Sequence, residues 1–159
     1  MGTGRPSHGS SAIRAAALAA LARRDYLTTE LDRKLQGQGF EPAATAVVIA
    51  ALTAERLLDD ARCIERFVTS RAERGQGPLR IARDLEAQGA SPALIEAAIG
   101  AGPDWRTVAR AVRHRKFGAA SPASWPEKAR QARFLQYRGF SSDHIRAALG
   151  AEFELDPQP

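Results

Sequence analysis

The chain has 159 residues, 44% of them hydrophobic and 26% charged, and its 23 lysines and arginines against 18 acidic residues give a formal net charge of +5. A surplus of basic residues suits an acidic or polyanionic partner. The single cysteine, Cys63, excludes an internal disulfide bond and any zinc site built from several cysteines. The apolar run from Ala15 to Ala22 is too short to span a bilayer. We therefore expect a soluble, cytoplasmic protein.

Three segments of the chain resemble one another at a constant spacing of 50 residues. The recurring positions are a leucine, a glycine four residues later and, in two copies, a phenylalanine after the glycine. They are Leu35, Gly39 and Phe40; Leu85 and Gly89; and Leu135, Gly139 and Phe140. Such self-similarity is typical of helical-repeat proteins. It predicts repeats at residues 11–57, 58–101 and 102–150, between a disordered arm at 1–10 and a flexible acidic tail at 151–159.

The first repeat is predicted to contain three helices. They cover residues 11–24, a segment from 28 or 29 to about 37–39, and residues 42–54. Gly39 is expected to end the second helix in the left-handed conformation that glycine adopts at little cost. Phe40 is then placed to close over the end of that helix as its apolar partner.

The middle repeat carries the clearest helix boundaries. Asp59 or Asp60 is suited to cap a helix that runs to about Arg74, and Gly75 and Gly77 are expected to end it. The second helix is predicted to begin at Pro78 and to bury a stripe of apolar side chains. This stripe consists of Leu79, Ile81, Ala82 and Leu85. Gly89 is expected to end that helix, and the third follows at 92–99.

The third repeat is predicted to contain helices at 104–116, 126–138 and 142–149, with a loop at 118–124. Phe134 is a structural residue of the second of these helices. No segment shows the period-two alternation of a strand bounded by hairpin turns. One unit of this size has too small a core to be robust alone, so the units should pack in a row. We therefore predict an all-α fold of three tandem three-helix repeats that form an elongated, curved body.

Residues with catalytic or metal-binding chemistry form no recognised arrangement. The histidines, His8, His114 and His144, lack the i, i+4 spacing of metal ligands. Adjacent Asp59 and Asp60 suit the start of a helix, where carboxylates cap free amides and complement the helix dipole. The sequence also contains no Gly-x-x-x-x-Gly-Lys-Ser/Thr loop and no Gly-x-Ser-x-Gly motif. We predict a protein without catalytic residues, metal or cofactor.

Basic residues flank the segment Gly75 to Pro78. Arg71 and Arg74 precede it and Arg80 and Arg83 follow it. Backbone amides and guanidinium groups could there surround an anion. A tight turn between two helices explains the same residues and is the favoured interpretation. The four arginines are candidate contacts with a partner in either case.

A second basic feature lies on the helix that carries Trp105, Val108 and Val112 on one face. Its basic residues are Arg106, Arg110, Arg113, Arg115 and Lys116. The first three are spaced i, i+4 and i+7, which predicts a single exposed stripe beside the apolar face. Because the positions that the three copies share are mainly cap and core residues, we expect binding residues among those that the copies do not share.

Three-helix units of this size also suggest a sequence-specific DNA-binding protein of the helix-turn-helix type. A recognition helix must offer polar side chains to the base edges. The predicted helix at 42–54 offers almost only apolar residues and the one at 92–100 offers a single glutamate, Glu96. The remaining alternative function is nonspecific DNA binding through phosphate contacts.

Several motifs, taken in order from Ala12 to Leu149, resemble the RecX family of bacterial recombinase regulators. The first are Leu21 to Tyr26, Glu30-Leu31 and Lys34-Leu35; the middle ones are Leu57 to Arg62, Ser70-Arg71, Gly75 and Gly77 to Ile81; the last are Lys116 to Gly118 and Arg133 to Phe140. The chain departs from the family pattern at Cys63-Ile64, where an aromatic-containing pair is frequent, and in the third copy, which lacks the proline after its Gly-Phe.

The resemblance implies a regulatory protein that binds the RecA filament on DNA and restrains strand exchange, ATP hydrolysis and co-protease activity in DNA repair and the SOS response. It also implies the absence of catalytic residues. We expect a monomer that binds RecA, binds single- or double-stranded DNA weakly and has no membrane partner. The candidate contact residues are Arg24, Arg71, Arg74, Arg80, Arg83, Arg106, Arg110, Arg113, Arg115 and Lys116.

Overall fold

The computed structural model describes residues 8–150, which form nine helices and no strand. The helices are α1 (His8–Leu21), α2 (Thr28–Gly37), α3 (Pro42–Ala54), α4 (Asp60–Glu73), α5 (Pro78–Ala87), α6 (Pro92–Gly100), α7 (Trp105–Phe117), α8 (Trp125–Tyr137) and α9 (Ser142–Leu149). None of these helices is long and apolar enough to cross a membrane. The predicted all-α class is confirmed.

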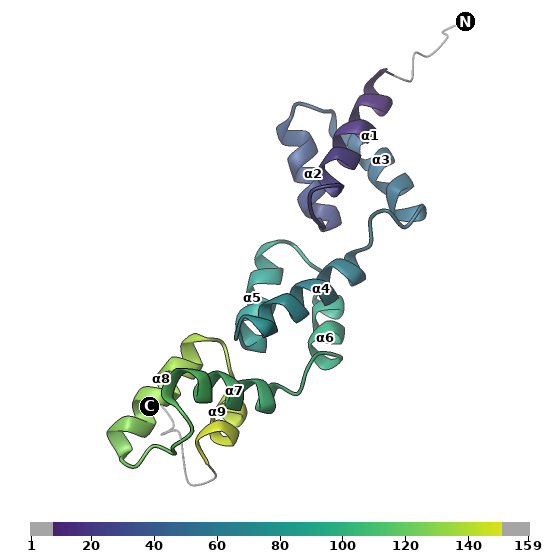
Figure 1. The fold of residues 1–159 in the computed structure, drawn as a ribbon. Helices are drawn as coiled ribbons and strands as arrows, with labels where there is room; N and C mark the ends of the chain where they lie inside the picture. The colour runs from purple at the N-terminus through teal and green to yellow at the C-terminus, as the bar shows by residue number, and fades with distance from the viewer. Residues whose placement is uncertain (1–7, 151–159) are drawn as a thin grey trace, which may run out of the picture.

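The nine helices form three bundles that follow one another in an elongated row, with α1 near one end and α9 near the other (Figure 1). Helices α1–α3, α4–α6 and α7–α9 pack within their own bundle. Each bundle surrounds a separate hydrophobic core. Three tandem three-helix repeats are therefore confirmed, and each is stabilised mainly by its own apolar contacts.

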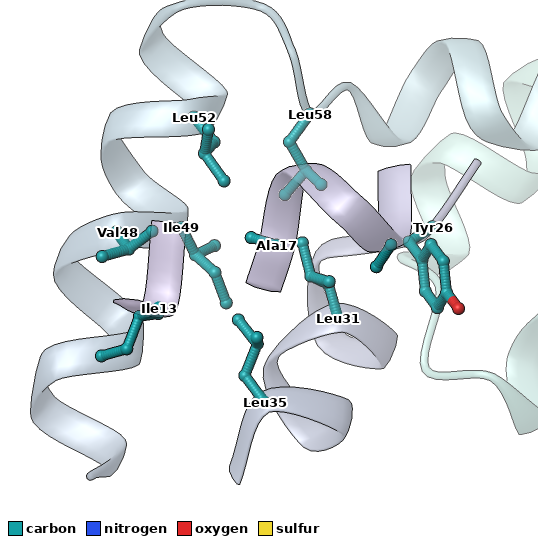
Figure 2. Packing of buried hydrophobic residues seen from close by; sticks show 10 residues of the cluster. Ile13, Ala17, Tyr26, Leu31, Leu35, Val48, Ile49, Leu52 and Leu58 are labelled. Carbon is teal, nitrogen blue, oxygen red and sulfur yellow. The ribbon is translucent and has the colours of Figure 1, made fainter. Parts of the chain in front are cut away.

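The first core shows how one repeat closes. Figure 2 shows Ala17 from α1, Leu31 from α2 and Leu52 from α3 among the side chains gathered between the three helices. Leu58, which the predicted boundary assigned to the second repeat, completes the same core with 2% of its surface exposed. In terms of packing, the first repeat therefore ends after Leu58.

The start of α1 differs from the prediction. The sequence assigned residues 8–10 to a disordered arm, whereas the helix begins at His8. Once the buried Ile13 and Ala17 fix the helix against its neighbours, each added residue costs little because propagation is easier than nucleation. The rest of the predicted arm and the predicted acidic tail lie outside the described residues.

The recurring leucine and glycine build the same turn in all three repeats. The glycine follows the second helix with φ of +93° at Gly39, +82° at Gly89 and +93° at Gly139. The next amide donates a hydrogen bond back to the carbonyl of the buried leucine. These bonds are Phe40 to Leu35 at 3.4 Å, Ala90 to Leu85 at 3.0 Å and Phe140 to Leu135 at 3.2 Å. The predicted glycine termination and its apolar partner are confirmed.

The second and third repeats meet through backbone. The amide of Gly77 donates to the carbonyl of Arg138 at 2.7 Å, and the amide of Leu79 donates to the carbonyl of Gly139 at 3.0 Å. A Cβ atom on Gly77 would lie 2.4 Å from the carbonyl carbon and oxygen of Gly139. Gly77 is therefore required for close approach between repeats. Its φ of −86° shows that it does not end α4 as predicted, and Gly75 has the left-handed conformation there instead.

The first and second repeats meet at the equivalent place, 50 residues earlier, but through side chains. The hydroxyl of Thr29 donates to the carbonyl of Gln88 at 3.1 Å. The amide and hydroxyl of Thr28 both donate to Asp60 at 2.8 Å. Leu27, which stands where the middle repeat has Gly77, is buried in the core of the second repeat. The two junctions thus share a position and differ in chemistry.

Candidate partner-binding surface

The turn between α4 and α5 does not cradle an anion. Its amides already donate to carbonyl oxygens of the chain over 2.7 to 3.0 Å. The pairs are Gly75 with Ala72, Gln76 with Arg71, Gly77 with Arg138, and Leu79 with Gly139. Pro78 has no amide hydrogen to offer. The tight-turn interpretation is therefore confirmed, and the turn joins two helices and two repeats.

Three of the four arginines around this turn have exposed and unpaired side chains. Within residues 8–150, no side chain or carbonyl forms a salt bridge or side-chain hydrogen bond with Arg74, Arg80 or Arg83. Arg71 is half-buried, and its guanidinium lies 4.7 Å from the centroid of the Phe67 ring. Arg74, Arg80 and Arg83 are therefore available to an external partner, while Arg71 also contributes to local packing.

A groove of about 590 Å³ lies where the second repeat meets the third, between α5 on one side and α8 and α9 on the other. Its lining includes Leu79, Arg80, Arg83, Tyr137, Ser142 and Ile145. Leu79 is 53% exposed and Tyr137 is 83% exposed. The sequence had placed Leu79 in the buried stripe of α5, and this prediction is wrong, because the first turn of α5 faces the groove. We call this feature the junction groove.

Arg113 was predicted to be an exposed partner contact, and this prediction is wrong. The residue is 7% exposed. Its Nη1 donates to the side-chain oxygen of Gln131 at 3.1 Å and to the carbonyl of Ala120 at 3.2 Å, and its Nη2 reaches the carbonyl of Gly118 at 3.5 Å. The loop after α7 folds back over the guanidinium. Arg113 therefore fastens this loop and α8 to α7.

Arg106 and Arg110 are exposed but are bound to α9. Arg106 forms a two-point ion pair with Asp143, with nitrogen to oxygen distances of 2.8 and 2.9 Å. The Nε of Arg110 donates to the carbonyl of Ala147 at 3.0 Å. The hydrogen bond from Arg106 is the main reason that the pKa of Asp143 lies below its ordinary value. Both arginines thus help to hold the third repeat together.

The remaining basic candidates also divide into residues with a partner inside the chain and residues without one. Arg24 pairs with Glu30 and lies 3.7 Å from the centroid of the Tyr26 ring. Lys116 lies 5.7 Å from the centroid of the Phe134 ring. Arg115 is exposed and has no ion pair within the described part of the chain. Only Arg115 in this group resembles the unpaired arginines of the middle repeat.

The polar residues considered for chemistry have structural roles. Asp59 caps α4 by accepting the amide of Arg62 at 3.1 Å, and Asp60 accepts two hydrogen bonds across the first junction. His144 forms a capping box with Ser141, in which each side chain accepts the other residue's amide. Among residues 8–150, no three His, Cys, Asp or Glu side chains gather as metal ligands. Burial raises the pKa of the Cys63 thiol to about 11, as expected for a residue that packs in a core.

Comparison with known proteins agrees with this architecture. The family models of the second and third three-helix domains of RecX match residues 59–99 and 106–149. The "Regulatory protein RecX" of Halorhodospira halophila is 49% identical over 148 residues, which cover 92% of each chain. The chain belongs to the RecX family. Proteins of the same name from Pseudomonas fluorescens and Acidithiobacillus ferrooxidans are 41% and 42% identical, over 87% and 89% of this chain and 90% and 91% of theirs.

A solved RecX structure supports the fold of this RecX-family chain. The crystal structure of RecX from Lactobacillus salivarius superposes with a TM-score of 0.75 at 21% sequence identity. The match covers 88% of this chain and 94% of the other. At this level of identity the similarity concerns the fold, and it shows that the Lactobacillus salivarius protein has a similar arrangement of helices.

Sequence reasoning missed one contributor to the junction groove of this RecX-family chain. Tyr137 lies in the motif Arg133 to Phe140, and nothing in the helical pattern distinguished it from a packed aromatic residue. Arg83, which the sequence did name as a candidate, has counterparts in Arg33 and Arg133 at the same position of the other repeats. The position is shared, and only the middle copy presents it beside the junction groove.

Proposed function

We propose that this protein is a cytoplasmic regulator that binds the RecA recombinase on DNA and restrains its strand exchange, ATP hydrolysis and co-protease activity in DNA repair and the SOS response. Membership of the RecX family supports this proposal, because the relatives that cover most of the chain are named regulatory proteins. The protein acts by binding and has no catalytic role of its own.

One observation carries the proposal beyond the family name. The middle repeat presents Arg74, Arg80 and Arg83 as unpaired cations, in the centre of an elongated row (Figure 1). A long body with unpaired arginines on its central repeat suits a partner that is itself a repeating polymer. Such a partner can contact the flanking repeats on neighbouring subunits while the central arginines meet acidic groups.

The role of polar residues in the second and third repeats also supports a binding function. Carboxylates such as Asp59 and Asp60 cap and join helices, and the buried Arg113 fastens a loop. Acid or base catalysis needs such groups free and directed at a substrate. Here Asp59, Asp60 and His144 are committed to the scaffold, and the unpaired side chains around the turn between α4 and α5 are arginines, which serve as cationic contacts rather than proton carriers.

Nonspecific DNA binding is a second candidate function. The exposed Arg115, beside His114 and Lys116 at the end of α7, favours it. Contacts of this kind neutralise phosphates and release counterions. This function predicts an affinity for DNA alone that falls steeply with salt, by roughly 0.7 to 0.9 logarithmic units of affinity per unit of log salt for each phosphate contacted.

The decisive experiment adds purified protein at substoichiometric amounts to RecA filaments on single-stranded DNA. We expect the DNA-dependent ATPase rate and the yield of strand exchange both to fall. A triple variant, Arg74→Ala with Arg80→Ala and Arg83→Ala, should lose most of this effect while keeping its helical circular dichroism spectrum. Unchanged RecA activity with the wild-type protein would refute the proposal.

A further inference from the structure

The junction groove combines exposed apolar surface with unpaired positive charge. Leu79 and Tyr137 are two of the most exposed large hydrophobic side chains in the described part of the chain, and both line this groove. Exposed apolar groups cost free energy in water unless they are covered, and a cluster of them beside polar residues marks an interaction site. Leu79 and Tyr137 together can contact an apolar side chain of a partner.

The charges of the groove indicate the chemistry of the ligand. Arg80 and Arg83 lie one turn apart on α5 and have no acidic partner among the described residues. Asp84 is the one carboxylate in the lining, so the groove is positive overall. Guanidinium groups bind carboxylates and phosphates through paired, charge-assisted hydrogen bonds. The ligand is therefore acidic.

The remaining lining favours a peptide over a nucleic acid. A DNA-binding site relies on a series of cations that neutralise several phosphates, whereas this groove holds two arginines and one opposing carboxylate, Asp84. The buried Phe140 and Ile145 lie beneath the groove, and Ser142 adds a hydroxyl group. Such a mixture of apolar surface with a few polar groups is typical of sites that bind side chains.

We propose that the junction groove binds an acidic peptide segment of the protein partner, with a carboxylate on Arg80 and Arg83 and an apolar side chain between Leu79 and Tyr137. This inference rests on the proposed function, in which the partner is the RecA filament. It assigns recognition to the interface between two repeats. The groove exists only because Gly77 and Gly139 bring α5 against the turn before α9.

Two groove variants of the full-length chain test the inference. One is Arg80→Ala with Arg83→Ala, and the other is Leu79→Ala with Tyr137→Ala. The matched control is Arg23→Ala with Arg33→Ala, which removes the same charge from exposed residues of the first repeat. Arg33 occupies the position of Arg83 in that repeat. Thermal unfolding monitored by circular dichroism confirms that each variant is folded.

Affinity is measured against RecA filaments on single-stranded DNA and, separately, against the same DNA without RecA. We expect each groove variant to bind filaments about tenfold or more weakly, the control to change less than about twofold, and binding to bare DNA to change equally little in all variants. Loss of bare-DNA binding in the groove variants would overturn the inference in favour of a nucleic-acid site.

Two further outcomes separate this inference from the proposed function. If the wild-type protein binds and inhibits filaments but the groove variants do so equally well, the inference is wrong and the function stands. If the wild-type protein binds no filament at all, the proposed function fails first. A photo-crosslinking amino acid at position 137 adds a direct readout. Its adduct should map to an acidic segment of RecA, and an adduct with DNA alone would contradict the inference.

Discussion

The middle and third repeats each carry a set of arginines, and the two sets are used differently. Arg80 and Arg83 extend from α5 without a partner among the described residues. Arg106 and Arg110 reach across to α9, and Arg113 is buried. The comparison teaches that helical spacing predicts where a cation emerges from its own helix, whereas its availability depends on what the rest of the fold places beside it.

The strongest test of this comparison is Arg113→Ala. The substitution removes three hydrogen bonds inside the third repeat and leaves the side-chain oxygen of Gln131 buried without its donor. Bonds from a charged group typically contribute about 1.5 to 3 kcal/mol each in net terms, and an unsatisfied buried partner adds a penalty. Gly118 and Ala120 are exposed, so their carbonyls can bond water instead. The buried bond to Gln131 therefore dominates, and we expect the free energy of unfolding to fall by about 2 to 4 kcal/mol, measured by urea denaturation.

Arg83→Ala is the matched control for that measurement. Its exposed side chain makes no bond to be lost, so unfolding should change by less than about 0.5 kcal/mol. Equal losses of stability in the two variants would contradict the division between structural and available arginines.

The double variant Arg106→Ala with Arg110→Ala tests the intermediate case. If the two arginines formed only an exposed contact stripe, the variant would lose partner binding at an unchanged thermal midpoint. The ion pair with Asp143 and the bond to Ala147 now predict a small loss of stability. Because the pair is exposed, the loss should be smaller than that of Arg113→Ala. Calorimetry measures it, and filament binding should weaken less than with Arg80→Ala and Arg83→Ala. If Arg106→Ala with Arg110→Ala weakened filament binding more than Arg80→Ala with Arg83→Ala, the main contact residues would lie on α7.

The smallest expected effect is a pH dependence at His144, beside the Arg106–Asp143 pair. Burial lowers the pKa of His144 below its ordinary value of 6.5, although Asp143 opposes the shift. The unfolded chain therefore binds this proton more readily, so the stabilising contribution is present above pH 6.5 and is lost as the pH falls through that value. Protonation also removes the lone pair that accepts the Ser141 amide.

Wild type and His144→Gln should be compared by thermal unfolding at about pH 7.5 and about pH 5.5, roughly one unit on either side of the ordinary pKa of histidine. The wild type should lose more stability on acidification than the variant, by less than about 1 kcal/mol. A larger loss of stability on acidification in His144→Gln than in the wild type would contradict the predicted direction of the pH effect.

Most of the fold could be predicted because its signals are local. The positive φ of Gly39, Gly89 and Gly139 required glycine, and their spacing of 50 residues exposed the repeat. Asp59 and Pro78 mark helix starts through their own chemistry. Each of these signals needs only a few neighbouring residues to act, so the sequence pattern is sufficient.

The candidate site was less predictable because it depends on contacts between distant segments. At 3.6 residues per turn, Arg113 points within about 20° of Arg106 around α7. No helical pattern separates these residues. One is buried because the loop at 118–124 folds over it, and the other is exposed beside α9. The environment of Leu79 likewise depends on the third repeat, which forms the other side of the groove that Leu79 lines.

The contact between Gly77 and Gly139 also fixes the order of the repeats. Solenoid proteins often gain or lose units by duplication when their interfaces are interchangeable. Here Leu27 stands at the first repeat's counterpart of Gly77, and its side chain fills the second core. Joining the first repeat directly to the third would bring that leucine to a place where a single Cβ atom has no room. The array is therefore a defined series of three different units, and a shortened or lengthened version would require redesigned junctions.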